Sequence, residues 1–226
     1  THSDKRSDLI TYQSYNEFSR GINSIPSSDA NYTDNYKHIR RTNLLLQNAE
    51  AYAKPEDIKQ YIGEAYFFRA YSYFDLLQLY GDVIITKKPL DITDPEMKVK
   101  RNDRSEVVDL IIDDLNHAVE NLPAFKELTT EEEGRISKEG AQAFLSRVAL
   151  YEGTWQKSRN GNQNTQRSAN LLDIAAKAAR TVIDAKYGYT FRLFGTDSET
   201  KILGDSAQKY MFILENEKSN PAGIKK

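Results

Sequence analysis

The chain contains no cysteine, which excludes disulfide bonds and thiolate chemistry. Its three histidines, His2, His38 and His117, lie far apart and lack the spacing of metal ligands. The formal net charge of −2 gives no overall attraction for nucleic acid or for an anionic membrane. No apolar run approaches the length of a membrane span, and no glycine-rich loop is placed to hold a phosphate. With no catalytic set, the sequence predicts a protein that is not an enzyme and uses no metal or cofactor.

What the sequence has instead is helical periodicity, most clearly in the tyrosine-rich stretch from Tyr61 to Asp82. Apolar residues recur there every three or four positions, which is typical of a helix rather than a strand. One apolar side includes Tyr73 and Leu77, and the other includes Phe68 and Leu79. A helix that is apolar over most of its circumference must be covered on two or more sides. This stretch is therefore predicted to be the central helix of the fold.

Polar residues interrupt the predicted apolar faces at a few positions. Arg69 must find a partner if it is buried, and we expect a structural ion pair or hydrogen bond rather than a ligand. Asn43 is expected to bind a neighbouring backbone group. Asp113 and Asp114 are adjacent and diverge by about 100° on a helix, so they do not form a ready acid–base pair. Both are expected on a solvated face.

Four more helices are predicted around the central one, so the predicted fold class is all-α. They are Asn35–Ala53, capped by Asp34; Ser105–Leu122, opening at Asp103 or Ser105; Ser137–Glu152, ended by Gly153; and Ser168–Ala185. Short extended segments are expected at Val83–Thr86 and Tyr210–Leu214.

The helices pair as an imperfect repeat. EAYFFRAYSYFDL in the central helix resembles QAFLSRVALYEG, which aligns Arg69 with Arg147. Bulky aromatic residues alternating with alanines on paired helices are tetratricopeptide-like, although the linkers are too long for a regular solenoid. We therefore predict a tetratricopeptide-like helical domain at 34–187, an N-terminal arm and loop at 1–33, and the start of an irregular C-terminal part at 188–226.

Four stretches resemble the SusD/RagB family of outer-membrane nutrient-binding lipoproteins. GEAYFFRAYSYFDLLQLYGDV is similar to that family's hallmark helix. NYKHIRRTNLLLQNAE before it, and RSEVVDLIIDDLNHAVENLP and GRISKEGAQAFLSRVALYEGTW after it, resemble the neighbouring repeat helices in the right order. The similarity covers roughly residues 30 to 190. One departure is Ile84, where the family usually has proline.

The resemblance implies a role at the cell surface. Members of the family sit on the extracellular face of the outer membrane, held by a lipidated N-terminal cysteine, and pass oligosaccharides or other nutrients to a SusC-like TonB-dependent transporter. The resemblance thus implies an oligosaccharide ligand, a transporter partner and a lipid anchor upstream of this chain. The C-terminal part is expected to be truncated, so this chain alone should bind ligand weakly or not at all. The residues alone leave a generic tetratricopeptide adaptor for a protein or peptide as the alternative.

The candidate ligand contacts are Asn31, Tyr32 and Asp34, just before the first repeat helix, where the family often has ligand-binding groups. Amide and carboxylate groups bind sugar hydroxyls, and aromatic faces stack on sugar rings. None of the three lies in a motif that matches the family residue by residue. Trp155, the only tryptophan, follows the predicted helix end at Gly153 and is expected to cover the bundle rather than bind a sugar.

Overall fold

Helices dominate the computed structural model, which describes residues 21–22, 24–132, 134–159 and 165–188. The α-helices of this part are α1 Ala30–Glu50, α2 Lys59–Tyr80, α3 Arg104–Asn121, α4 Lys138–Arg159 and α5 Thr165–Ile183. Short 3₁₀ turns occur at η2 Pro55–Ile58, η3 Pro95–Lys98, η4 Phe125–Glu127 and η5 Thr130–Glu132. The described residues contain no β-strand, only an isolated bridge between Val83 and Asn102 in the expected extended segment. The other expected segment, Tyr210–Leu214, lies outside the described residues. The predicted all-α, tetratricopeptide-like class is confirmed.

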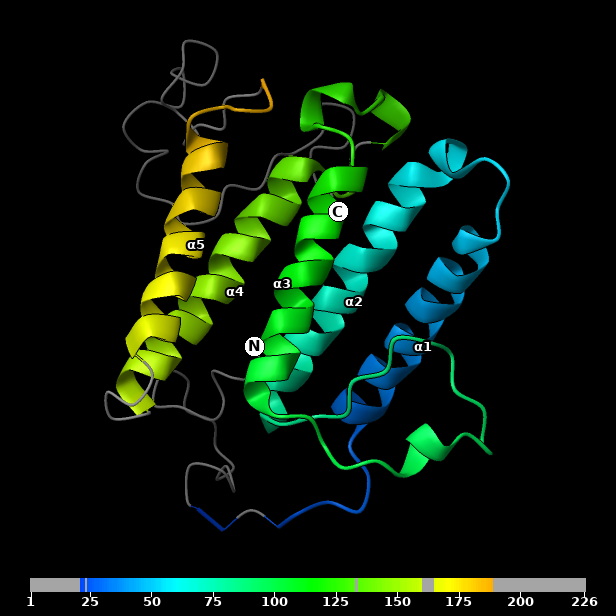
Figure 1. Cartoon of the computed structure of the whole chain (residues 1–226), viewed down its shortest axis with the longest axis vertical. Coiled ribbons are helices and arrows are strands. Elements are labelled where there is room, and N and C mark those ends of the chain that lie inside the picture. Colours follow the sequence, from blue (N-terminus) through cyan, green and yellow to red (C-terminus); the bar gives the residue numbers. More distant parts are fainter. Residues whose placement is uncertain (1–20, 23, 133, 160–164, 189–226) are drawn as a thin grey trace, which may run out of the picture.

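The α-helices stand side by side in chain order, each packed against the next (Figure 1). α2 lies between α1 and α3, as predicted for the central helix. The most extensive contacts join α2 to α3 and α4 to α5, which are the two predicted repeat units. Not one of the helices described here is both long and apolar enough to cross a membrane.

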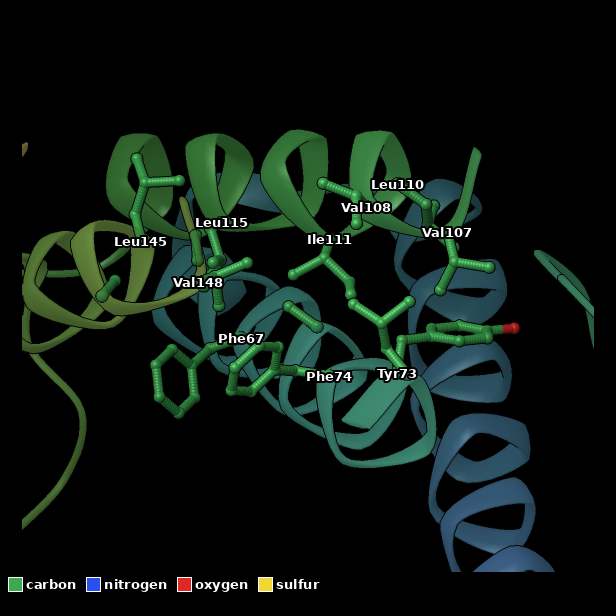
Figure 2. Close-up of a cluster of buried hydrophobic side chains, with 14 of the residues drawn as sticks. Phe67, Tyr73, Phe74, Val107, Val108, Leu110, Ile111, Leu115, Leu145 and Val148 are labelled. Atoms are coloured by element: carbon green, nitrogen blue, oxygen red, sulfur yellow. The ribbon is translucent and has the colours of Figure 1, made fainter. Parts of the chain in front are cut away.

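The core is a cluster of apolar side chains mainly from α2, α3 and α4 (Figure 2), joined by Ile39 of α1 and by Leu171 and Ala178 of α5. Tyr73 and Leu77 of α2, Ile111 and Leu115 of α3 and Val148 of α4 are each 0% exposed. These positions follow the three-to-four-residue spacing of their helices, and for α2 they confirm the predicted apolar side with Tyr73 and Leu77.

The second apolar side of α2 is only partly covered, contrary to the prediction. Phe68 is 48% exposed and Leu79 is 45% exposed. Their neighbour Tyr71 stacks on Phe144 of α4 at a ring distance of 5.5 Å but is itself 53% exposed. α1 and α3 pack against other sides of the helix, and α4 reaches this one mainly through long aromatic side chains. α2 therefore exposes several apolar side chains on the surface of the described bundle.

The first helix begins earlier than predicted, at Ala30, so Asp34 does not cap it. The cap is Asp29, whose carboxylate accepts a hydrogen bond from the Asn31 backbone nitrogen at 2.9 Å. The Tyr80 hydroxyl donates to the same carboxylate at 2.7 Å. Burial raises the pKa of Tyr80 to about 12, so the phenol remains a donor at neutral pH. This contact with a distant helix is not visible in local sequence patterns.

The fourth helix also differs from the prediction, because α4 continues through Gly153 to Arg159. A Cβ at Gly153 would lie 3.0 Å from side-chain atoms of Leu172. The glycine therefore allows α4 and α5 to approach closely and does not end the helix. Trp155, on this last part of α4, packs under the guanidinium of Arg104, which lies 4.3 Å from its ring centroid.

Two buried polar residues, Arg69 of α2 and Asp114 of α3, form an ion pair in the core. Arg69, 5% exposed, donates to both carboxylate oxygens of Asp114 at 2.8 and 2.6 Å. Its third contact is a donation from Nη1 to Asn43 Oδ1 at 2.8 Å. The expected structural ion pair of Arg69 is confirmed. Asp113 is exposed, as predicted. The prediction that Asp114 is also solvated is wrong, because its side chain is 0% exposed. Burial raises the pKa of the Asp114 carboxyl, and the guanidinium opposes that rise.

Candidate functional site

A groove of about 320 Å³ runs beside the N-terminal half of α1. One face of the helix and the segment that follows α2 form its walls, and we call it the α1 groove. Its lining residues are Tyr32, Tyr36, Arg40, Ile84, Thr86, Lys88, Leu90, Glu96 and Met97. Small-molecule sites typically combine an apolar and aromatic lining with a few polar groups in this way.

The helical wall is built from residues four positions apart, which share one face of α1. The Tyr32 ring lies 4.8 Å from the Tyr36 ring and meets the Tyr80 ring edge-on at 5.2 Å. The Tyr36 hydroxyl donates to the carbonyl oxygen of Ile84 at 2.7 Å. Burial raises the pKa of Tyr36 above its ordinary value, so this donor stays protonated. The two phenol rings are thus fixed at one end of the α1 groove.

The opposite wall is an extended segment whose backbone is bound by helix side chains. Asn43 donates from Nδ2 to the carbonyl oxygens of Thr86 at 2.9 Å and Lys88 at 3.3 Å, which confirms the expected backbone contact of this residue. The Tyr73 hydroxyl accepts a hydrogen bond from the Thr86 nitrogen at 2.8 Å. Because Asn43 also accepts from Arg69, the ion pair in the core helps to hold this wall.

Three charged side chains face the α1 groove. Lys88 Nζ lies 2.7 Å from Glu96 Oε1. Arg40 donates from Nη1 to the carbonyl oxygen of Leu90 at 3.0 Å. Within the described ranges, no carboxylate lies in ion-pair contact with Arg40. The described lining of the groove therefore has two cationic side chains and one anionic side chain, which gives this lining a net positive charge.

Only one of the three predicted contact residues lies in this groove. Tyr32 lines it, whereas Asn31 and Asp34 are exposed on the first turns of α1. Asn31 binds the capping carboxylate, and Asp34 forms an ion pair with Lys37 at 2.8 Å. The three residues were expected in a loop, and that placement is wrong because the helix starts before them.

The sequence interpretation missed Tyr36 and Arg40 as groove residues. With the helix starting at Ala30, their four-residue spacing from Tyr32 would have placed all three on one face. Lys88 carries no comparable signal, because tertiary hydrogen bonds determine the position of the segment opposite α1.

A second, more open cavity of about 570 Å³ lies between α3 and α5. Asp109 and Arg167 in its lining form an ion pair with each other at 2.8 Å. Its other described lining residues are polar or aliphatic, without an aromatic ring. A sugar ring therefore has less to stack against here than in the α1 groove. Elsewhere too, the described His, Asp and Glu side chains nowhere form a group of three that could hold a metal ion.

Comparison with known proteins identifies the family. The model of the SusD-like family, described as starch-binding and associating with the outer membrane, matches residues 1–150. The chain belongs to the SusD-like family. It is 33% identical over 133 residues to SusD-like protein P38 of Formosa agariphila, a match that covers 57% of this chain and 25% of that protein.

Solved SusD-like structures share the fold. One, from Bacteroides fragilis, is 28% identical with a TM-score of 0.64 and is matched by 81% of this chain over 32% of its own length. A second, described as a laminarin binding SusD-like protein, is 27% identical with a TM-score of 0.60, over 77% of this chain and 35% of its own. The SusD-like chain thus spans only about a quarter to a third of the length of these relatives.

Proposed function

We propose that the full-length SusD-like protein binds an oligosaccharide at the cell surface and that the α1 groove forms part of the binding site. The observation that carries the proposal is the combination of two tyrosine rings with charged side chains in one groove. Sugars place their C–H faces on aromatic rings and bind charged groups through their hydroxyls. The relative described as laminarin binding supports a glycan as the ligand.

The proposed partner is a SusC-like TonB-dependent transporter, with the protein held on the extracellular face by a lipidated cysteine upstream of this chain. The family's description as associating with the outer membrane supports this location. The exposed apolar side chains of α2, which include Phe68, Tyr71 and Leu79, offer a surface suited to a protein contact.

A pull-down from solubilised outer membranes tests this partnership. The full-length protein is expected to retain the transporter encoded beside it, and the upstream gene sequence is expected to encode a signal peptide ending in a lipidated cysteine. Retention of a cytosolic protein without the transporter would instead favour a tetratricopeptide adaptor.

The binding site is tested by Tyr32→Ala in the full-length protein. Loss of one aromatic contact of about 1.5 kcal/mol should weaken glycan binding about tenfold. Calorimetry against neutral glycans, including laminari-oligosaccharides, measures the change. Asp34→Ala is the matched control, because Asp34 is exposed on the same helix outside the groove, and it should leave the affinity unchanged. If Asp34→Ala weakens binding and Tyr32→Ala does not, the α1 groove is not the site.

A further inference from the structure

Arg40 differs from the arginines that are bound within the bundle. Arg69 and Arg135 each donate two hydrogen bonds to one carboxylate, at 2.6 to 2.8 Å. Arg40 makes a single hydrogen bond, from Nη1 to the carbonyl oxygen of Leu90, and faces no carboxylate in the part of the chain that the structure describes. Its Nε and Nη2 donors and its charge are therefore available to a ligand in the α1 groove.

The second cation of the groove is held only weakly. Lys88 and Glu96 form a surface ion pair, with side chains that are 53% and 47% exposed. Solvent screening makes such exposed pairs weak, so Lys88 can turn toward a ligand anion at little cost. Among the described lining residues, Glu96 is the one acidic side chain, and its charge offsets one of the two cations. An anionic ligand is thus attracted by the net charge of the groove.

We infer that the sugar residue bound in the α1 groove carries a carboxylate, as a uronic acid does. This inference rests on the proposed function of the same groove. A planar guanidinium presents parallel N–H donors that match the two oxygens of a carboxylate. Its hydrogen bond to Leu90 holds Arg40 in place, and the Tyr32 ring offers an apolar face to the pyranose C–H groups. Glu96 is left to accept a hydrogen bond from a sugar hydroxyl.

The test compares a short oligogalacturonide with its methyl ester, which has the same ring but no charge. By calorimetry on the full-length protein at low salt, the acid should bind about tenfold more tightly than the ester. This preference should shrink as salt screens the charges. Arg40→Gln should weaken binding of the acid far more than binding of the ester, so that the two affinities become similar. Arg40→Lys should keep only part of the preference, because an ammonium lacks the planar pair of donors.

Arg41→Gln is the matched control, since Arg41 is exposed on the same helix but does not line the groove. It should leave the preference for the acid intact, and melting curves should show both glutamine variants folded. Equal affinities for acid and ester, with a neutral laminari-oligosaccharide still bound, would overturn the inference and leave the proposed function standing. A preference that survives Arg40→Gln, or tighter binding of a sulfated oligosaccharide, would also overturn it. Binding of none of these glycans would overturn the proposed function itself.

Discussion

Asp114→Ala is expected to lower the free energy of unfolding by about 3–5 kcal/mol. The substitution removes the carboxylate that accepts two hydrogen bonds from Arg69, a side chain that is 5% exposed. The guanidinium would keep one acceptor, Asn43 Oδ1, and would otherwise be a buried charge without compensation. Chemical denaturation followed by circular dichroism measures the loss.

Asp113→Ala is the matched control for this experiment. Asp113 is the preceding residue, its side chain is 61% exposed, and its contact with His117 spans 3.8 Å. We expect a change within about 0.5 kcal/mol, as for most surface substitutions. Equal losses for the two variants would contradict the buried ion pair. Replacing Arg69 and Asp114 together with apolar residues of similar size should recover much of the stability, because no unpaired charge is then left behind.

Leu77→Ala is expected to destabilise the protein by about 2–5 kcal/mol, the usual range for emptying a buried leucine site. Leu77 is 0% exposed in the cluster where α2 meets its neighbours. The loss combines the apolar contacts removed with the cavity left in a core that relaxes only partly. Urea denaturation measures the difference in the free energy of unfolding. The dependence of that free energy on urea concentration, the m value, should be the same for both proteins.

Gln78→Ala provides the comparison for Leu77, because Gln78 is the next residue of α2 and is exposed. It should change stability by less than about 0.5 kcal/mol. Glu64 on the same helix is less suitable, because Arg135 binds both of its carboxylate oxygens at 2.7 Å. Similar losses for Leu77→Ala and Gln78→Ala would mean that α2 presents a different side to the core.

Most of the fold could be predicted from periodicity, because burial of one side imposes a regular spacing on every helix. The start of α3 was also predictable, since the Glu106 carboxylate accepts a hydrogen bond from the Asp103 backbone nitrogen at 3.0 Å, which is one half of a capping box. Two helix ends were not predictable for a common reason. Asp29 is bound by a tyrosine from another helix, and Gly153 is needed for a close approach to α5, so both depend on tertiary contacts.

The candidate site was less accessible to sequence reasoning than the fold. Tyr32 was chosen together with Asn31 and Asp34 because the family often has ligand-binding groups just before the first repeat helix, and of the three Tyr32 alone lines the groove. The segment opposite α1 has no periodicity of its own. Asn43 holds it, and the position of Asn43 is in turn coupled to the ion pair of Arg69. Such a series of contacts between distant residues cannot be predicted from the spacing of residues in the sequence.

The extended wall of the α1 groove is held through its backbone rather than through its side chains. The acceptors are the carbonyl oxygens of Ile84, Thr86, Lys88 and Leu90. Every amino acid supplies a carbonyl oxygen, so substitutions along this segment can change the chemistry offered to a ligand without changing the path of the chain. The helices thus fix the backbone of this segment, whereas its side chains are free to vary. Under the proposed function, selectivity for a nutrient can therefore change through substitutions in this segment while the helices that position it stay the same.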